Sequence, residues 1–289
     1  MKKTATCQLY GLIGHPVKHS YSAVMHNAAF AYYKMNARYQ LFEVSPQELE
    51  VFFKETIFEK KINGLNVTVP HKEKVVVYLN GHISLGVRIN QAVNTVRVEK
   101  DRTLSGFNTD GAGFLRDLKS KKVQVTGKKI SLIGAGGGAK AVATSLASKK
   151  PKQLLIFDIN RAKSTALVDI LKEFYPDVGA QAVESLEGLN IQGADLLIHA
   201  TPVGMKKTDP LLVEKAWLSK DLFVYDLIYN PLETKLLKTA REAGCRYSNG
   251  LGMLLYQGCL AFQIWTQKRA PLEVMRQALK EKIGGAINV

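Results

Sequence analysis

The sequence is poor in cysteine and has no long apolar run. Its cysteines are three, an odd number, and none lies in a C-x-x-C pair or at a spacing typical of zinc ligands: Cys7, Cys245 and Cys259. This pattern argues against a disulfide scaffold and a metal cofactor, and it favours free thiols in a reducing cytoplasm. No apolar stretch approaches the roughly 18 residues that a membrane span needs. We therefore expect a cytoplasmic protein that does not span a bilayer.

The first 20 residues, MKKTATCQLYGLIGHPVKHS, open like a signal peptide but do not continue like one. Their basic start is followed by an apolar stretch that Gln8 interrupts and that His15 and Pro16 end. This stretch predicts a first β-strand in place of a leader.

Acidic residues are also few, 25 against 40 lysines and arginines, which leaves a formal net charge of +15. Nucleic-acid binders carry such an excess. Here, however, the basic residues are spread along the whole chain, and the densest group, KSKKVQVTGKK at 119–129, lacks the interleaved aromatics of a single-strand binder. We expect no nucleic-acid partner. A positive field equally favours a small anionic ligand, such as a carboxylate or a dinucleotide.

The 289 residues suit two domains of ordinary size, and both have an α/β pattern. In the first third, short β-like runs alternate with helix-like runs, which predicts βα units on a mostly parallel sheet: CQLYGLIG, YSAVMHNAAFAYY, RYQLFEV, SPQELEVFFKETI and GLNVTV. Ser45, Pro46 and Glu48 predict a helix that starts at residue 45. Residues 92–111 predict a pair of strands with a turn at Asp101 and Arg102.

The α/β pattern restarts after the basic stretch and predicts a second domain. A strand and helix, KISLIGAGGGAKAVATSLASKK, are followed by three apolar runs typical of buried strands, KQLLIFDI, ADLLIHAT and LFVYDLIY. Residues 250–283 are helical in pattern except near Pro271. This final helix pair must pack on its own domain or return to the first one.

The strongest local signal for a ligand is the glycine-rich stretch LIGAGGGAKAV. A buried-type strand, 129–133, runs into Gly134, Ala135, Gly136, Gly137 and Gly138 and then directly into a helix. This is the context of a dinucleotide-binding turn, where glycines let the backbone approach a pyrophosphate and the helix start supplies free N–H groups. The alternative is a plain tight turn between strand and helix.

An acidic residue, Asp158, ends the next strand, 24 positions after Gly134 (158 − 134). A carboxylate there accepts hydrogen bonds from the adenosine ribose and repels a 2′-phosphate, so Asp158 favours NAD over NADP. Arg161 and Lys163 follow closely. They either hold a phosphate or are solvated charges at a helix start, and the sequence leaves both alternatives open.

Polar residues of the first domain gather where predicted strands end: Ser20, Ser22, Asn66, Thr68, Lys72, Asn94 and Asp110. Hydroxyls and amides at such places often only cap turns. Lys72 follows the β-type run of 66–69 and Pro70, so it is either one more solvated lysine or a group that the strand aims at a ligand.

Eight motifs follow one another over nearly the whole chain: GHPVKHSYS, GLNVTVPHK, QAVNT, GFNTDG, IGAGGGAKA, ATPVGM, YDLIYNPLET and GLGMLLYQ. In this order they resemble the shikimate dehydrogenase family. The resemblance implies a substrate domain, 1–112, completed by C-terminal helices, 251–289, and a Rossmann NAD(P) domain, 113–250. It also implies an oxidoreductase that reduces 3-dehydroshikimate to shikimate with a nicotinamide cofactor, in chorismate and aromatic amino-acid biosynthesis.

The resemblance also implies roles for single residues. Lys72 and Asp110 match the catalytic pair of the family. The substrate carboxylate falls to Ser20, Ser22 and Tyr229, and the ring hydroxyls fall to Asn66, Thr68, Lys72, Asn94, Asp110 and Gln257. Gly134 to Gly138 match the phosphate loop, while Leu227 and Gly250 match positions beside the nicotinamide. A lysine suits the chemistry, because hydride arrival at a ketone develops negative charge on its oxygen and calls for a positioned acid.

Two departures from the family pattern are visible. Ala23 stands where many members have a proline, and Asp158-Ile159-Asn160 stand where NADP-using members have an Asn-Arg-Thr run that clamps the 2′-phosphate. The cofactor is therefore NADP or NAD, with the residues favouring NAD as in the quinate/shikimate dehydrogenase branch. The alternative function is an NAD-dependent quinate/shikimate dehydrogenase that works oxidatively. A basic binding protein without activity is disfavoured, because Lys72 and Asp110 are both retained; a homodimer remains open.

Overall fold

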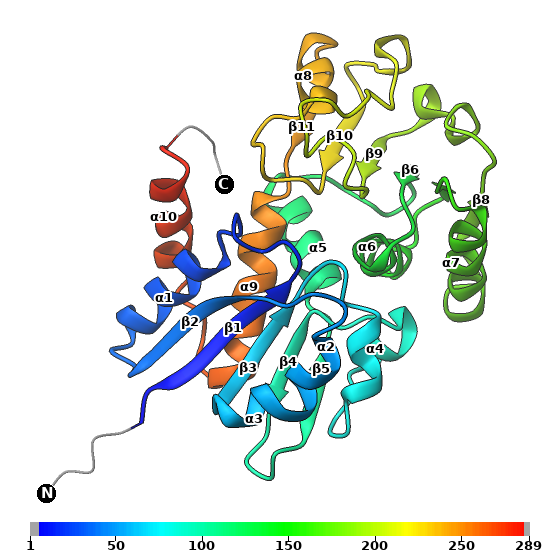
Figure 1. Ribbon diagram of the computed structural model, residues 1–289. Helices are drawn as coiled ribbons and strands as arrows, with labels where there is room; N and C mark the ends of the chain where they lie inside the picture. Colours follow the sequence, from blue (N-terminus) through cyan, green and yellow to red (C-terminus); the bar gives the residue numbers. More distant parts are fainter. Residues whose placement is uncertain (1–5, 286–289) are drawn as a thin grey trace, which may run out of the picture. The chain divides into compact units, whose positions relative to one another are not determined.

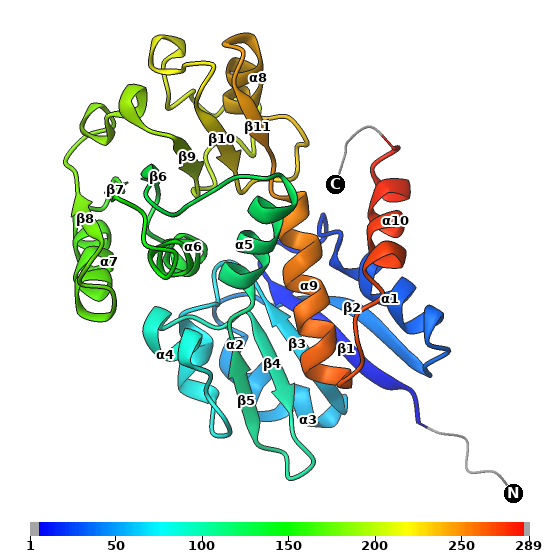
Figure 2. The ribbon, with the colours of Figure 1, turned by 180° about the vertical axis from the view of Figure 1, so that it is seen from behind.

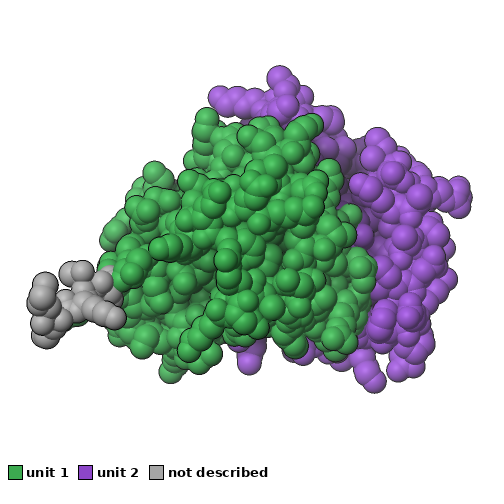
Figure 3. Space-filling view, turned by 60° about the horizontal axis from the view of Figure 1, so that its bottom comes forward, with its two compact units in different colours: residues 1–113, 254–289 green, residues 114–253 purple. Residues whose placement is uncertain are grey.

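The structure, a computed structural model, describes residues 6–285 (Figure 1). The chain forms two compact units, residues 1–113 with 254–289 and residues 114–253, which Figure 3 shows in different colours. Two helices, α5 (Asp110–Ser120) and α9 (Leu251–Thr266), contain the points at which the chain passes from one unit to the other. Each unit has its own sheet and its own apolar core.

The sheet of the first unit has the order β2-β1-β3-β4-β5. Its strands are β1 (Gln8–Gly14), β2 (Ala37–Glu43), β3 (Ile62–Val67), β4 (Thr95–Val98) and β5 (Leu104–Phe107). β1 is parallel to β2 and β3, whereas β4 is antiparallel to β3 and β5. The predicted strand pair is confirmed, and Arg102 in its turn has a φ of 70°.

Helices cover both faces of this sheet (Figures 1 and 2). On one face lie α1 (Ser22–Tyr32), α9 and α10 (Leu272–Lys282). The rings of Phe30 in α1 and Trp265 in α9 pack on Tyr10 of β1. On the other face lie α2 (Leu49–Val51), a π-helical turn (Phe52–Thr56), α3 (Ile57–Glu59), a 3₁₀ turn (Lys74–Tyr78) and α4 (Leu85–Asn90). The C-terminal helices thus return to the first unit, and this prediction is confirmed.

Two local predictions in the first unit are wrong. The helix expected from residue 45 begins at Leu49. The expected bond from the Ser45 N–H to Glu48 Oε2 is present at 2.8 Å, but the N–H of Glu48 donates to the Ser45 carbonyl three residues back, so these residues form a turn before the first α-helical bond, from Phe52 N–H to the Glu48 carbonyl. The strand expected over 64–69 ends at Val67, and Val69 is 68% exposed where a buried side chain was expected.

The second unit has a six-stranded parallel sheet with the order β11-β10-β9-β6-β7-β8. Its strands are β6 (Lys129–Ile133), β7 (Gln153–Phe157), β8 (Gly179–Ala182), β9 (Leu196–His199), β10 (Phe223–Asp226) and β11 (Arg246–Ser248). This is the strand order of a Rossmann fold, whose ligands bind at the carboxyl ends of the strands where the order reverses. The predicted Rossmann domain is confirmed.

Besides α5, most of which belongs to this unit, three helices are longer than a single turn: α6 (Gly137–Ala147), α7 (Arg161–Phe174) and α8 (Lys235–Glu242). The four central strands match the predicted apolar runs, but the short outer strands β8 and β11 were not predicted. Their sequences, GAQA and RYS, have no apolar run, because edge strands bury little surface. Among residues 6–285, no helix is long and apolar enough to cross a membrane.

Candidate active site and cofactor site

Lys72 lies in a short segment that main-chain bonds fix after β3. The N–H of His71 donates to the carbonyl of Thr68, and the N–H of Val93 donates to the carbonyl of Lys72 at 2.8 Å. The buried His71 ring binds the carbonyl of Val44 through Nε2 at 2.7 Å, and because a carbonyl only accepts, Nε2 carries the proton. Burial lowers the pKa of His71. A neutral, buried imidazole thus anchors the residue before Lys72.

The Lys72 ammonium pairs with the Asp110 carboxylate. Nζ of Lys72 donates to Oδ2 of Asp110 at 2.6 Å, and the two side chains are 17% and 6% exposed. Asp110 is the first residue of α5, where the positive end of the helix dipole favours a carboxylate. Its other oxygen, Oδ1, accepts from Nδ2 of Asn94 at 2.8 Å. The expected closeness of Lys72 and Asp110 is thus observed, and it leaves two ammonium N–H groups for a ligand.

Asn94 is surrounded by partners within the protein. Its Oδ1 accepts from the hydroxyl of Thr95 at 3.0 Å and the main-chain N–H of Thr109 at 2.8 Å. Its Nδ2 faces three acceptors, on Asp110, Thr109 and Gln257, at 2.8, 2.9 and 3.3 Å. An amide has only two N–H groups, so none is left over for a ligand. The geometry makes Asn94 the group that orients Asp110.

Asn66 is buried and nearly saturated in the same way. Its Nδ2 donates to the carbonyl of Asn94 and the hydroxyl of Thr95, both at 3.1 Å, and its Oδ1 accepts from the Tyr39 hydroxyl at 2.9 Å. Both N–H groups of Asn66 are therefore used within the protein, so Asn66 cannot donate to a ligand. Tyr39, whose ring stacks on His26 with centroids 4.5 Å apart, fixes the amide in this orientation.

Gln257 reaches this network from α9. Its Nε2 donates to the carbonyl of Leu254 at 2.9 Å, and its Oε1 lies 3.3 Å from Asn94 Nδ2 and 3.5 Å from the Thr109 hydroxyl. Asn94 and Gln257 are 163 positions apart in the sequence. The returning helix therefore completes the polar cluster of the first unit.

Ser20 and Ser22 meet at the start of α1. Their hydroxyls are 3.2 Å apart, and the N–H of Ser22 donates to the Ser20 hydroxyl at the same distance. α1, which is fully described, has no acidic residue in its first turn, so its N-terminal N–H groups and dipole favour an anion. Half-buried Thr68 directly follows β3. Tyr229 belongs to the second unit, and its predicted contact with the carboxylate stays a prediction.

The glycine-rich turn connects β6 to α6 and fits a dinucleotide. Gly134 has a φ of 109°, and a Cβ there would lie 2.9 Å from the Ala200 carbonyl oxygen, so only glycine suits this position. A Cβ on Gly136, by contrast, would meet no atom within 4 Å. The turn therefore leaves open space beside the first N–H groups of α6, which begins at Gly137. A pyrophosphate requires such an approach to the backbone.

Asp158 braces this turn from the end of β7. Its Oδ2 accepts from the Ala135 N–H at 2.7 Å and its Oδ1 accepts from the Asn160 N–H at 2.8 Å. Each oxygen keeps a lone pair for a ribose hydroxyl. Of the two basic residues considered for a phosphate, Arg161 pairs instead with Glu184 at 2.7 Å, both largely exposed, and Lys163 is exposed in the first turn of α7.

Leu227 and Gly250 lie next to each other at the same edge of the sheet. The N–H of Leu227 donates to the carbonyl of His199, and a Cβ on Gly250 would lie 2.0 Å from the Leu227 carbonyl oxygen. A Cβ on Gly138 would lie 3.9 Å from a methyl group of Leu227. The structure thus brings Leu227 between the glycine-rich turn and Gly250, and their place beside the nicotinamide stays a prediction.

A buried histidine and aspartate at this edge were missed by sequence reasoning. His199 ends β9 and Asp226 ends β10, and their side chains are 3% and 0% exposed. Nδ1 of His199 lies 3.0 Å from Oδ1 of Asp226, and its Nε2 lies 2.6 Å from the Thr201 hydroxyl. The available signal was a polar residue at the end of each of two apolar runs, LLIHAT and LFVYDL.

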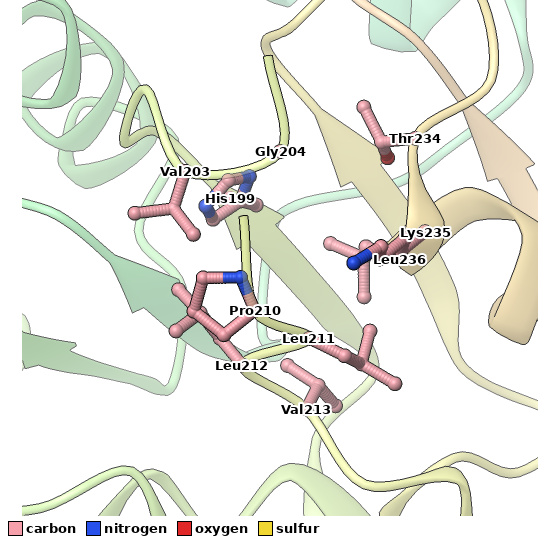
Figure 4. Close-up of a pocket in the computed structure, with 10 residues that line it drawn as sticks. All are labelled: His199, Val203, Gly204, Pro210, Leu211, Leu212, Val213, Thr234, Lys235 and Leu236. Carbon is pink, nitrogen blue, oxygen red and sulfur yellow. The ribbon is translucent and has the colours of Figure 1, made fainter. Parts of the chain in front are cut away.

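The His199 ring also lines a small pocket, shown in Figure 4. The other lining residues come from 203–213 and from the start of α8, and most are apolar: Val203, Gly204, Pro210, Leu211, Leu212, Val213, Thr234, Lys235 and Leu236. Its volume of about 10 Å³ is room for one water molecule, so no cofactor binds there.

Three protein-family models match the chain. A shikimate dehydrogenase substrate-binding domain matches residues 12–96, a shikimate/quinate 5-dehydrogenase domain matches 117–224, and a shikimate 5′-dehydrogenase C-terminal domain matches 250–280. A curated relative from Methanopyrus kandleri, named shikimate dehydrogenase (NADP(+)), is 43% identical over 286 residues, which are 96% of this chain and 97% of the relative. The chain belongs to the shikimate dehydrogenase family.

Solved structures of shikimate dehydrogenases have the same fold. The enzyme from Aquifex aeolicus superposes with a TM-score of 0.87 at 37% identity, covering 96% of this chain and 99% of that one. The enzyme from Listeria monocytogenes, in complex with shikimate and NAD, superposes with a TM-score of 0.84 at 36% identity, covering 96% and 98%. Most of the candidate residues lie within the matched domains, whereas Asp110, Leu227 and Tyr229 lie outside their limits.

Proposed function

We propose that this member of the shikimate dehydrogenase family catalyses the reversible, nicotinamide-dependent reduction of 3-dehydroshikimate to shikimate, within chorismate and aromatic amino-acid biosynthesis. The observation that carries the proposal is the Lys72–Asp110 pair at 2.6 Å, held by Asn94 within the first unit. The names of relatives about 40% identical over almost the whole chain support it.

Lys72 is the proposed acid–base group. The nicotinamide cofactor supplies the hydride that reduces the ketone. As charge develops on the ketone oxygen, an N–H of Lys72 stabilises it and delivers the proton, and in the reverse direction the amine accepts the hydroxyl proton. Asp110 orients the ammonium and, because Asn94 and the start of α5 hold it in turn, it can do so without moving.

The substrate carboxylate binds, in this proposal, at the start of α1 with the hydroxyls of Ser20 and Ser22, and with Tyr229. The ring hydroxyls bind Thr68, Gln257, Lys72 and Asp110. Asn66 cannot donate to a ring hydroxyl, since its two N–H groups are already used. Asn94 acts on the substrate through Asp110.

We propose NAD as the preferred cofactor. Asp158 places a negative charge at the end of β7 beside the glycine-rich turn, which favours ribose hydroxyls and repels a 2′-phosphate. Arg161, the nearer basic residue in the sequence, is paired with Glu184. The names of the curated relatives point the other way, towards NADP.

The direct test is an assay of shikimate oxidation with NAD and with NADP in turn, followed through the absorbance of the reduced cofactor. We expect turnover with both and a higher kcat/KM for NAD. Absence of turnover with either cofactor would overturn the proposed function, while a higher kcat/KM for NADP would overturn only the cofactor preference.

Quinate is the second candidate substrate, because the family model for residues 117–224 describes shikimate and quinate dehydrogenases together. The two acids are compared under the same conditions with the preferred cofactor. A kcat/KM for quinate equal to that for shikimate would make the enzyme a quinate/shikimate dehydrogenase. We expect shikimate to be favoured, since both serines of the carboxylate site are present.

A further inference from the structure

We propose that His199 is a positioning residue for the cofactor: its ring fixes the Thr201 hydroxyl and, through it, the loop on which the glycine-rich turn packs. The proposal rests on the nicotinamide cofactor proposed above. Two neighbouring strands of the second unit each end in a buried polar residue: β9 ends in His199 and β10 ends in Asp226.

The positions of the protons follow from the partners. The carboxylate of Asp226 accepts from the N–H of Ile228 at 3.0 Å and from the hydroxyl of Thr234 at 2.6 Å. Facing this acceptor, Nδ1 of His199 is the nitrogen that carries hydrogen. In the neutral ring Nε2 then offers a lone pair, to which the hydroxyl of Thr201 donates at 2.6 Å.

The orientation of Thr201 matters for the glycine-rich turn. Because its hydroxyl points to His199, its methyl group faces the other way and lies 3.0 Å from where a Cβ of Gly134 would be. The hydroxyl oxygen also accepts the N–H of Val203 at 3.2 Å, which holds the next turn of the loop. The lone pair on Nε2 of His199 thus fixes the rotamer of Thr201, and the Thr201 hydroxyl in turn fixes the main chain at Val203.

The remainder of this loop is fixed from its far end. Oδ2 of Asp209 accepts from the N–H groups of Gly204 at 2.8 Å and Lys206 at 3.0 Å. Nζ of Lys235, at the start of α8, donates to the Asp209 carbonyl at 2.6 Å. The loop therefore has two anchors, and His199 is the one next to the glycine-rich turn.

Asp226 extends the same arrangement to the following loop. The Thr234 hydroxyl that it binds caps α8 by accepting from the N–H of Leu237 at 3.3 Å. Leu227, between Asp226 and Ile228, is the residue expected beside the nicotinamide. The pair of His199 and Asp226 thus sets the loops after both β9 and β10, on the edge where the cofactor is proposed to bind.

Two amide substitutions of His199 each remove one of the two hydrogen bonds that its ring makes. Asparagine places its amide near the position of Nδ1, so His199→Asn keeps a donor for Asp226 and loses the acceptor for Thr201. Glutamine reaches the position of Nε2, so His199→Gln keeps an acceptor for Thr201 and loses the bond to Asp226. Thr201→Val removes the hydroxyl and keeps the shape of the side chain.

We expect the dissociation constant for NADH, measured by its fluorescence without substrate, to rise about tenfold in His199→Asn and in Thr201→Val, as expected for one lost buried hydrogen bond. His199→Gln should remain within about threefold of the original protein. In turnover, KM for the cofactor should rise by the same factors while kcat changes less. The matched control is Thr239→Val, which removes a half-buried hydroxyl that donates to the Lys235 carbonyl within α8 and should leave the dissociation constant unchanged.

The double variant His199→Asn with Thr201→Val decides whether one bond is responsible. If both substitutions break the same contact, the double variant binds NADH no more weakly than either single one. Multiplied effects, or unchanged affinity in Thr201→Val, would overturn the proposal, and Thr201→Val gives this answer even if the histidine variants fail to fold. NADH binding without shikimate oxidation would refute only the proposed function, whereas a protein that binds neither NADH nor NADPH refutes both.

Discussion

The candidate sites of the two units consist of different kinds of chemical group. In the first unit, side chains bind one another: Asn66 and Asn94 use all of their N–H groups within the protein, and Lys72 keeps two ammonium N–H groups for a ligand. In the second unit, the surface is main chain and open space at Gly136, and carboxylates such as Asp158 bind backbone N–H groups.

The difference predicts how each unit responds to substitution. In the first unit one group, the Lys72 ammonium, is proposed to react, so its loss should abolish most of the activity. In the second unit the main chain and open space are proposed to bind the cofactor, so substitutions should change the cofactor affinity and the NAD/NADP preference by smaller factors. The four predictions below test this contrast.

The largest effect is expected at Lys72. Lys72→Ala should lower kcat by about 10² or more, with substrate affinity within about tenfold, because the ammonium acts mainly in the transition state. Lys74→Ala removes the same charge from an exposed position two residues on and should leave kcat unchanged. Thermal unfolding is measured beside the kinetics, since Asp110 loses its ion pair. A normal kcat in a folded Lys72→Ala protein would end the catalytic role.

Acid should destabilise the first unit through His26, which lies under the ring of Tyr39. Burial lowers the pKa of His26 from 6.5 to about 3. As the pH falls below 6.5 the unfolded chain takes up the proton first, so the stability contributed by the neutral ring is complete above 6.5 and decreases towards pH 3. Between pH 7 and pH 4 the loss is about 3 kcal/mol.

His26→Phe keeps an aromatic ring and removes the titration. Urea unfolding is followed through Trp265, which belongs to the first unit, in a Trp217→Phe background that removes the other tryptophan. The free energy of unfolding of His26→Phe should depend less on pH than that of its parent over this range. If the free energy of unfolding depends equally on pH in the two proteins, groups other than His26 cause the loss of stability in acid.

At Gly136 a side chain should affect the cofactor and spare the fold. Gly136→Val fills open space at an ordinary extended backbone position, φ −75° and ψ −178°, so we expect about 30-fold weaker NADH binding, or about 2 kcal/mol, and an unchanged melting temperature. Gly250→Ala is the contrasting variant, because its Cβ would meet the Leu227 carbonyl oxygen at 2.0 Å. It should lower the melting temperature. Equal melting temperatures in the two variants would contradict this distinction.

The smallest effects are expected at the residues that tune the cofactor. Asp158→Asn keeps an oxygen for the Ala135 N–H and removes the charge, so the ratio of kcat/KM for NADP to that for NAD should rise about tenfold. Glu184→Gln releases Arg161 from its ion pair and should raise the ratio about threefold. Glu187→Gln, another acidic residue near β8, serves as the control. An unaltered ratio in Asp158→Asn would mean that Asp158 does not face the 2′ position.

Much of this arrangement could be predicted from the sequence. Apolar runs located the central strands, and the residues around Gly134 correctly predicted a strand, a glycine-rich turn and a helix. Lys72 and Asp110, 38 positions apart, were expected together only because the resemblance supplied the pairing. A local sequence pattern spans too few residues to pair two positions so far apart in the chain.

Other features depend on tertiary partners and so escaped prediction. Tyr39 resembled an ordinary strand residue until its hydroxyl was seen to bind Asn66. His199 ended an apolar run like a solvated strand end, yet it is buried because Asp226 and Thr201 satisfy both of its nitrogens. Val69 fitted the alternation of a strand that stops two residues earlier.

The open space at Gly136 also bears on how this protein could diverge over evolutionary time. Most random changes destabilise a protein, and selection removes those that lower its stability below what function needs, but a Cβ at this position meets no atom within 4 Å. A descendant with one such change would persist in the cell as a folded protein, with the polar cluster around Lys72 unaltered and a weaker affinity for its cofactor. A metabolic enzyme would then be one codon closer to a sensor or carrier of its own substrate.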